Sequence, residues 1–178
     1  MKKSIVRLCA ALVAVVAVFS MAACGQEKKL EEAYCTDVST SIEALGQKGE
    51  ALNSAITAFL ANVNDDTRAS VLAAITDLDT LYAEIRDLNP PEKYTNVQKS
   101  LTEGVELALQ ATEIYKKEFT EVTNDTFNDA FVKRVQEGDD LMKQANAKLL
   151  EGSQQCVVSS PPENFNSANG VSEESTAA

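Results

Sequence analysis

The chain has 178 residues and carries 16 Lys and Arg against 27 Asp and Glu, for a net charge of −11. It contains no histidine, which excludes Ser/His/Asp and Cys/His catalysis and removes the commonest metal ligand in proteins. The acidic balance disfavours binding to nucleic acid, and the length suits one domain with a single core.

The first two dozen residues are organised differently from the rest. A basic segment, MKKSIVR, precedes the apolar run LCAALVAVVAVF, and the small residues SMAA then lead to Cys24. A basic head, an apolar middle and a small-residue exit are the parts of an export signal. The apolar stretch from Leu8 to Ala23 is shorter than the roughly 20 residues that a membrane-spanning helix needs, so a retained anchor helix is the weaker interpretation. We predict a cleaved signal peptide over residues 1–23.

The residues Met21, Ala22, Ala23 and Cys24 resemble the lipobox of bacterial lipoproteins, in which a branched apolar residue is more usual where Met21 stands. The resemblance implies diacylglycerol on the Cys24 sulfur, cleavage between Ala23 and Cys24, and an N-acyl chain such as palmitate. Two or more acyl chains hold a protein firmly on a membrane. The protein is then expected to be extracytoplasmic and anchored to the cell membrane. An ordinary secreted protein with an incidental cysteine is the alternative.

Processing at Cys24 changes how the four cysteines are counted. Cys9 leaves with the signal peptide and Cys24 carries the lipid, so Cys35 and Cys156 remain. In an oxidising compartment these two are expected to form a disulfide. Two free buried thiols are the alternative.

Large apolar residues then recur at helical spacing in four stretches, which predict helices over about residues 28–63, 67–88, 91–122 and 126–151. Gly46 and Gly49 weaken the first helix by about 1 kcal/mol each relative to Ala and are candidate kink positions. No stretch alternates with period two for long enough to predict a strand.

The helix boundaries follow from turn and capping residues. The segment NVNDDT separates the first two stretches with side chains suited to helix caps. In NPPEKY, Pro91 suits the first position of the third helix. Thr126, three residues before Asp129, matches a capping box at the start of the fourth.

Four amphipathic helices joined by short loops predict an all-α fold, an antiparallel up-down-up-down four-helix bundle packed like a coiled coil. We expect the bundle to span residues 30–156, after a lipidated linker over residues 24–29. Residues 157–178 are rich in Ser, Asn, Pro, Gly and Glu and predict a disordered tail.

The predicted topology supports the pairing of Cys35 with Cys156, because the first and fourth helices are neighbours. At 1.5 Å per residue, Cys35 lies about 42 Å along the first helix from the end opposite the lipid. Cys156 lies about 45 Å along the fourth helix from the same end, provided that this helix continues through Gly152.

Candidate binding chemistry is sparse. The two loops at the end away from the lipid hold short acids, and weak candidates for Ca²⁺ ligands are Asp65, Asp66, Asp125 and Asp129. Helix capping is the alternative interpretation of these residues. Acid pairs also occur on the helices, at Asp77 with Asp79 and at Glu103 with Glu106, but a solvated acidic face explains them better than acid–base chemistry.

We therefore expect no catalytic residue, no enzymatic activity and no cofactor beyond the lipid on Cys24. The expected role is binding or protein interaction, with the membrane contacted through the lipid, an unknown protein partner and no nucleic acid. The alternative is a bundle that carries Ca²⁺ at its far tip or a small apolar ligand between its helices. That ligand would lie near the aromatic residues Tyr82, Tyr94, Tyr115 and Phe119.

Overall fold

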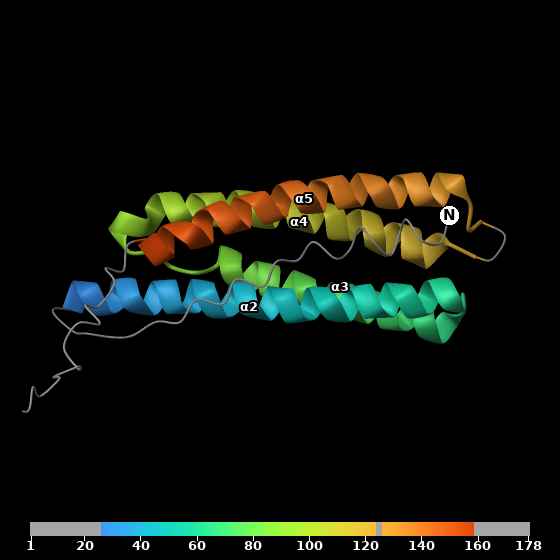
Figure 1. Cartoon of the computed structure of the whole chain (residues 1–178), viewed down its shortest axis with the longest axis horizontal. Coiled ribbons are helices and arrows are strands. Elements are labelled where there is room, and N and C mark those ends of the chain that lie inside the picture. Colours follow the sequence, from blue (N-terminus) through green and yellow to red (C-terminus); the bar gives the residue numbers. More distant parts are fainter. Residues whose placement is uncertain (1–25, 124–125, 159–178) are drawn as a thin grey trace, which may run out of the picture.

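The computed structural model describes residues 26–123 and 126–158. Its four α-helices are α2 (Gln26–Ala61), α3 (Asp65–Arg86), α4 (Thr95–Glu121) and α5 (Asp129–Val158), and a short 3-10 helix, η2 (Glu92–Tyr94), precedes α4. These ranges contain no strand. Successive helices run in opposite directions (Figure 1), which confirms the predicted all-α four-helix bundle. The predicted signal peptide, Cys24 and residues 159–178 lie outside the described residues.

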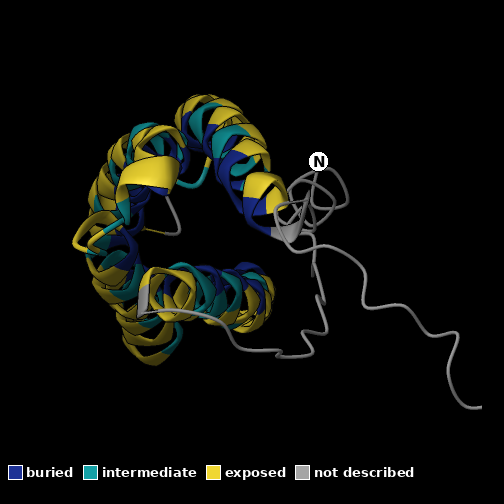
Figure 2. Ribbon diagram, turned by 90° about the vertical axis from the view of Figure 1, so that its left-hand side faces the viewer, coloured by how far each residue is buried: buried dark blue, intermediate teal, exposed yellow. Residues whose placement is uncertain are grey.

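The buried positions explain why the helices pack lengthwise. In α3 they are separated alternately by four and three residues, at Val71, Ile75, Leu78, Tyr82 and Ile85. The other helices follow a similar spacing, which is that of coiled-coil seams and places one apolar stripe along each helix. Figure 2 shows the buried residues on the faces that the helices turn toward one another, with the exposed residues on the outside.

The helices are not packed with equal closeness. Among the four pairs of neighbouring helices, α4 and α5 have the most extensive contact and α2 and α5 the least. Glycine allows the close approach of α4 to α5, because a Cβ atom on Gly104 would lie 2.9 Å from Leu149 Cγ and one on Gly152 would lie 2.8 Å from Leu101 Cδ2. The chain therefore forms two helical hairpins that meet mainly through α3 and α4.

The two ends of the bundle are distinct. One end, here called the disulfide end, contains the first turns of α2, the segment 87–94 and the last turns of α5. The opposite end contains the loops 62–64 and 122–128, of which residues 124 and 125 are not described. At the opposite end, the buried ring of Phe119 lies edge-on to Phe59 and to Phe131, with centroid distances of 5.4 and 5.5 Å. These aromatic contacts join α2, α4 and α5.

Several helix boundaries differ from the sequence-based predictions. The linker predicted over residues 24–29 overlaps α2, which begins at Gln26 and continues without a break through Gly46 and Gly49 to Ala61. Pro91 is not the first residue of the third helix. Its backbone is extended, with φ −58° and ψ 155°, and α4 begins only at Thr95.

The predicted capping box of Thr126 and Asp129 is wrong. Thr126 instead accepts a hydrogen bond from the Thr123 backbone N–H at 2.7 Å. Asn128 provides the cap of α5, because its Oδ1 accepts from the backbone N–H groups of Ala130 and Phe131 at 3.0 and 3.2 Å. α5 also extends past the predicted end at residue 151 as far as Val158.

Candidate functional site

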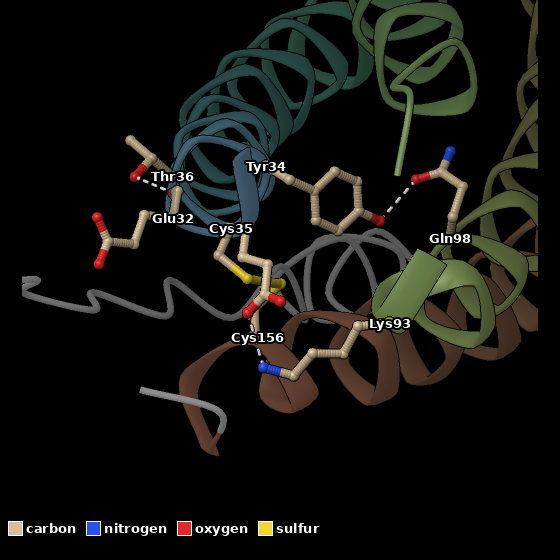
Figure 3. The surroundings of a disulfide bond; sticks show 8 residues. Glu32, Tyr34, Cys35, Thr36, Lys93, Gln98 and Cys156 are labelled. Atoms are coloured by element: carbon tan, nitrogen blue, oxygen red, sulfur yellow. Dashed lines mark hydrogen bonds and ion pairs between the residues drawn. A yellow bond between two sulfur atoms is a disulfide. The ribbon is translucent and has the colours of Figure 1, made fainter. Parts of the chain in front are cut away.

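The disulfide end holds several specific contacts between different helices. Cys35 of α2 and Cys156 of α5 form a disulfide with a Cα–Cα distance of 5.3 Å across a sequence separation of 121 residues. Both cysteines are buried. Figure 3 shows the bond between the two helices. The structure thus joins the two cysteines that the sequence pairs, and it links α2 and α5 covalently where their other packing is sparse.

Gln98 connects three elements beside the disulfide. Tyr34 points toward Gln98 (Figure 3) and its hydroxyl donates to Gln98 Oε1 at 2.8 Å. Gln98 Nε2 in turn donates to the carbonyl oxygens of Ile85 and Arg86 at 2.9 and 3.0 Å. These carbonyls lie in the last turn of α3, and the Ile85 oxygen also accepts from the Leu88 backbone N–H at 3.4 Å. Gln98 of α4 therefore caps α3 and binds α2 at the same time.

Aromatic and ionic contacts complete this end. The rings of Tyr34 and Tyr94 pack with a centroid distance of 5.5 Å, and Lys93 Nζ lies 5.1 Å from the centre of the Tyr94 ring. Lys93 Nζ also pairs with Glu31 Oε2 at 2.8 Å, and this hydrogen bond raises the pKa of Lys93. Burial raises the pKa of Tyr34 to about 12, so its hydroxyl keeps the proton that it donates to Gln98.

The candidate Ca²⁺ ligands at the opposite end lie at helix starts. Asp65 and Asp66 are in the first turn of α3 and Asp129 is in the first turn of α5, where a carboxylate favours the positive end of the helix dipole. Asp65 pairs with Arg68. Asp125 lies outside the described residues. Within residues 26–123 and 126–158, no group of three or more Cys, Asp or Glu is arranged to hold a metal ion.

The loop before α3 has a complete capping arrangement of its own. Asn64 Oδ1 accepts from the Thr67 backbone N–H at 2.9 Å, and Thr67 Oγ1 accepts from the Asn64 backbone N–H at 3.4 Å. Arg68 Nη2 donates to the Val122 carbonyl oxygen at 2.7 Å. Asparagine and aspartate at this tip thus act on helix ends, and Arg68 holds α3 to the end of α4.

Three of the four acids in the pairs named from the sequence form ion pairs. Asp77 pairs with Lys48 of α2 at 2.7 Å, and Asp79 pairs with Lys116 of α4. Glu103 pairs with Lys148 of α5 at 3.0 Å, which lowers the pKa of Glu103. Each of these carboxylates therefore links its helix to a neighbouring one.

The aromatic residues proposed to line a ligand site are buried and engaged with the protein. The Tyr82 hydroxyl donates to Met142 Sδ at 3.4 Å, and the Tyr115 hydroxyl donates to Asp139 Oδ1 at 2.6 Å. Tyr94 packs on Tyr34, and Phe119 packs on Phe59 and Phe131. Burial raises the pKa of Tyr82. These contacts act between helices, as expected of core side chains.

Two buried carboxylates between α4 and α5 were not singled out from the sequence. Glu118 is 3% exposed and pairs with Arg134 Nε at 2.6 Å. Asp139 is 6% exposed and accepts the hydrogen bond from Tyr115. Burial raises the pKa of Asp139, which the hydrogen bond from Tyr115 opposes. The burial of Asp139 could have been inferred from helical spacing, because Asp139 stands four residues after Val135, which is buried, and so lies on the same face of the helix.

Comparisons with known proteins add no assignment. Family models, curated proteins and solved structures all gave no match to this chain. Among the described residues, no helix combines the length and the hydropathy needed to cross a membrane.

Proposed function

We propose that this protein is a lipid-anchored, extracytoplasmic helical bundle that acts by binding another protein and not by catalysis. The observation that carries the anchor is the sequence Met21-Ala22-Ala23-Cys24 after a basic head and an apolar run. An attached diacylglycerol would hold an acidic domain that has little electrostatic attraction to an anionic membrane.

The arrangement of the bundle supports this proposal. α2 begins at Gln26, two residues after the cysteine that would carry the lipid, so the disulfide end is the end nearest to the membrane. The opposite end and the outer helix faces are then directed toward possible partners. Three of the four carboxylates considered for acid–base chemistry, Asp77, Asp79 and Glu103, form interhelical ion pairs, which is a structural use of these groups.

Metabolic labelling with a fatty acid tests the anchor. The wild-type protein should incorporate the label, partition into detergent and have a mature N-terminus at Cys24, whereas Cys24→Ala should lose the label. Cys9→Ala is the matched control, because this cysteine lies in the predicted signal peptide, and it should be labelled like the wild type. Equal labelling of Cys24→Ala and the wild type would contradict lipidation at Cys24.

Photocrosslinking on intact cells tests the binding role. A crosslinking residue at Ala61 or Ala69, both exposed near the opposite end, should yield a defined protein adduct. The same residue at Ala33, exposed near the disulfide end, should yield less of that adduct. If no position gives a protein adduct in cells where the protein is anchored, the binding role is wrong.

A further inference from the structure

The first two turns of α2 carry an exposed leucine next to two lysines. Leu30 is 60% exposed, whereas the other large apolar side chains of the described residues are buried or half-buried. Lys28 and Lys29, directly before it, are also exposed. A single exposed leucine is ordinary on a protein surface, so the argument depends on where Leu30 lies.

Leu30 is close to the predicted lipid attachment point. The two residue steps from Cys24 to Gln26 span at most about 7 Å, and the four helical residues from Gln26 to Leu30 add about 6 Å. The headgroup region of a bilayer is about 5–8 Å thick on each side. A lipid on Cys24 therefore keeps Leu30 within about 13 Å of the attachment point, which is close enough for Leu30 and its neighbouring lysines to reach the lipid headgroups.

The first turns of α2 are held firmly to the rest of the disulfide end. Glu31 pairs with Lys93 of η2 at 2.8 Å, Tyr34 is bonded to Gln98 of α4, and Cys35 is bonded to α5. Contacts to three other elements within five residues fix the direction of this segment relative to the bundle. A membrane contact at Leu30 would thus orient the whole domain.

Net charge is spread nearly evenly between this end and the rest of the described residues. The segments 27–32 and 86–93, joined by the pair of Glu31 and Lys93, hold four cations and five acids. The other described residues hold nine cations and eighteen acids. Relative to their lengths of 14 and 117 residues, the two parts are about equally acidic, so the orientation rests on Leu30 and the two lysines and not on net charge.

From these observations we infer that Lys28, Lys29 and Leu30 form a second contact with the lipid surface, which keeps the bundle upright with its opposite end farthest from the membrane. This inference rests on the proposed lipid anchor. The leucine enters the interface and the two lysines lie among anionic headgroups. The lipid holds the protein at the membrane, and the second contact sets its direction.

Tryptophan fluorescence tests the orientation, since the chain contains no tryptophan and Leu30→Trp gives a single probe. The mature lipidated variant is reconstituted in vesicles of equal parts phosphatidylcholine and phosphatidylglycerol, with and without bromine on the acyl chains. The emission of Leu30→Trp should shift to shorter wavelength and be quenched by the brominated lipid. Ala61→Trp, exposed at the last residue of α2, should show neither change.

A charge-reversal pair tests the lysines. Lys28→Glu with Lys29→Glu, introduced into Leu30→Trp, should reduce the quenching in these vesicles. Lys117→Glu with Lys133→Glu makes the same change in charge at exposed positions of α4 and α5 and should leave most of the quenching in place. Equal losses from the two pairs would show that net charge alone acts and would overturn the assigned role of Lys28 and Lys29.

Vesicle flotation separates failure of this inference from failure of the anchor. If the protein floats with the vesicles but Leu30→Trp and Ala61→Trp are quenched equally or not at all, the second contact is wrong and the anchor stands. If the purified protein does not float, the lipid anchor is wrong and the second contact, which rests on it, is overturned as well.

Discussion

Asp139 shows how one polar residue is accommodated in the core of this bundle. Its carboxylate is buried between α4 and α5 and accepts a hydrogen bond from Tyr115. Lys143 lowers and Asp140 raises its pKa, but the largest effect is burial, and the pKa is raised overall. A buried charge with a single donor costs stability, so Asp139 should make the bundle less stable at neutral pH than in mild acid.

We therefore predict that Asp139→Asn gains stability relative to the wild type as the pH rises. The folded carboxyl binds its proton more tightly than the unfolded one, whose pKa is about 3.9. Its contribution is fully present below that pH and is lost as the pH rises through the raised folded pKa. The asparagine oxygen can still accept from Tyr115 but carries no charge. Urea unfolding at pH 4 and pH 7 measures the difference.

The control for this experiment is Asp140→Asn. Asp140 is exposed and pairs with Lys143 at 2.7 Å, so its substitution should change stability little at either pH. If Asp139→Asn is destabilised equally at both pH values, burial of the charge is not what sets the stability of this site.

At the scale of the helices, the space around a glycine shows how closely its helix packs on a neighbour. A Cβ atom on Gly138 of α5 would lie 2.6 Å from Tyr115 Cε1, whereas one on Gly46 of α2 would have no neighbouring atom within 4 Å. The hydrogen bond to Asp139 restricts how far Tyr115 can move away. The same residue type therefore serves close packing in α5 and has no such role in α2.

We predict opposite effects for alanine at these two glycines. Gly138→Ala should lower the free energy of unfolding by about 1–3 kcal/mol, because the added methyl group overpacks the contact with Tyr115. Gly46→Ala should raise it by about 0.5–1 kcal/mol, because alanine is the better helix former and space is open. Urea unfolding of the two variants measures both values. A loss in Gly46→Ala as large as that in Gly138→Ala would contradict this explanation.

For the molecule as a whole, the disulfide replaces packing between the first and last helices. The contact of α2 with α5 is the least extensive among the four pairs of neighbouring helices, and the bond between Cys35 and Cys156 closes the bundle at one end. Because the two cysteines are 121 residues apart in sequence, the bond restricts most of the unfolded chain.

We predict that Cys35→Ser with Cys156→Ser lowers the free energy of unfolding by about 4–5 kcal/mol, the entropy expected for closing a loop of this length. Urea unfolding of the double variant and the wild type measures this loss. The control is a thiol assay on the unfolded mature wild-type protein, which should react only after reduction. A reaction without reduction would show that the disulfide or the lipid on Cys24 is absent.

Repetition along the chain is what made the helices predictable. The stripe from Val71 to Ile85 identifies a helix without knowledge of its neighbours, because burial of one helix face follows from helical geometry alone. Short loops then leave antiparallel neighbours as the simplest arrangement. The pairing of Cys35 with Cys156 followed from counting cysteines and from helix length.

Other features could not be predicted from a local pattern, because they depend on contacts between different helices. Gln98 stands among apolar stripe residues, and only the ends of α2 and α3 beside it show why an amide is buried there. Gly152 favours a helix end locally, yet α5 continues to Val158 because the glycine allows α5 to approach Leu101 of α4. Tertiary packing of this kind outweighs a propensity of about 1 kcal/mol.

By itself, the sequence determined the helical class, the antiparallel order and the cysteine pair, because each depends on residues close in the chain or on simple counting, while the lipid anchor stays a prediction. Only the tertiary structure decided the close pairing of α4 with α5, the caps supplied by Gln98 and Asn128, and the burial of Glu118 and Asp139. Those features depend on which side chains meet when separate helices pack, and the free energy of such contacts is not encoded in any one segment.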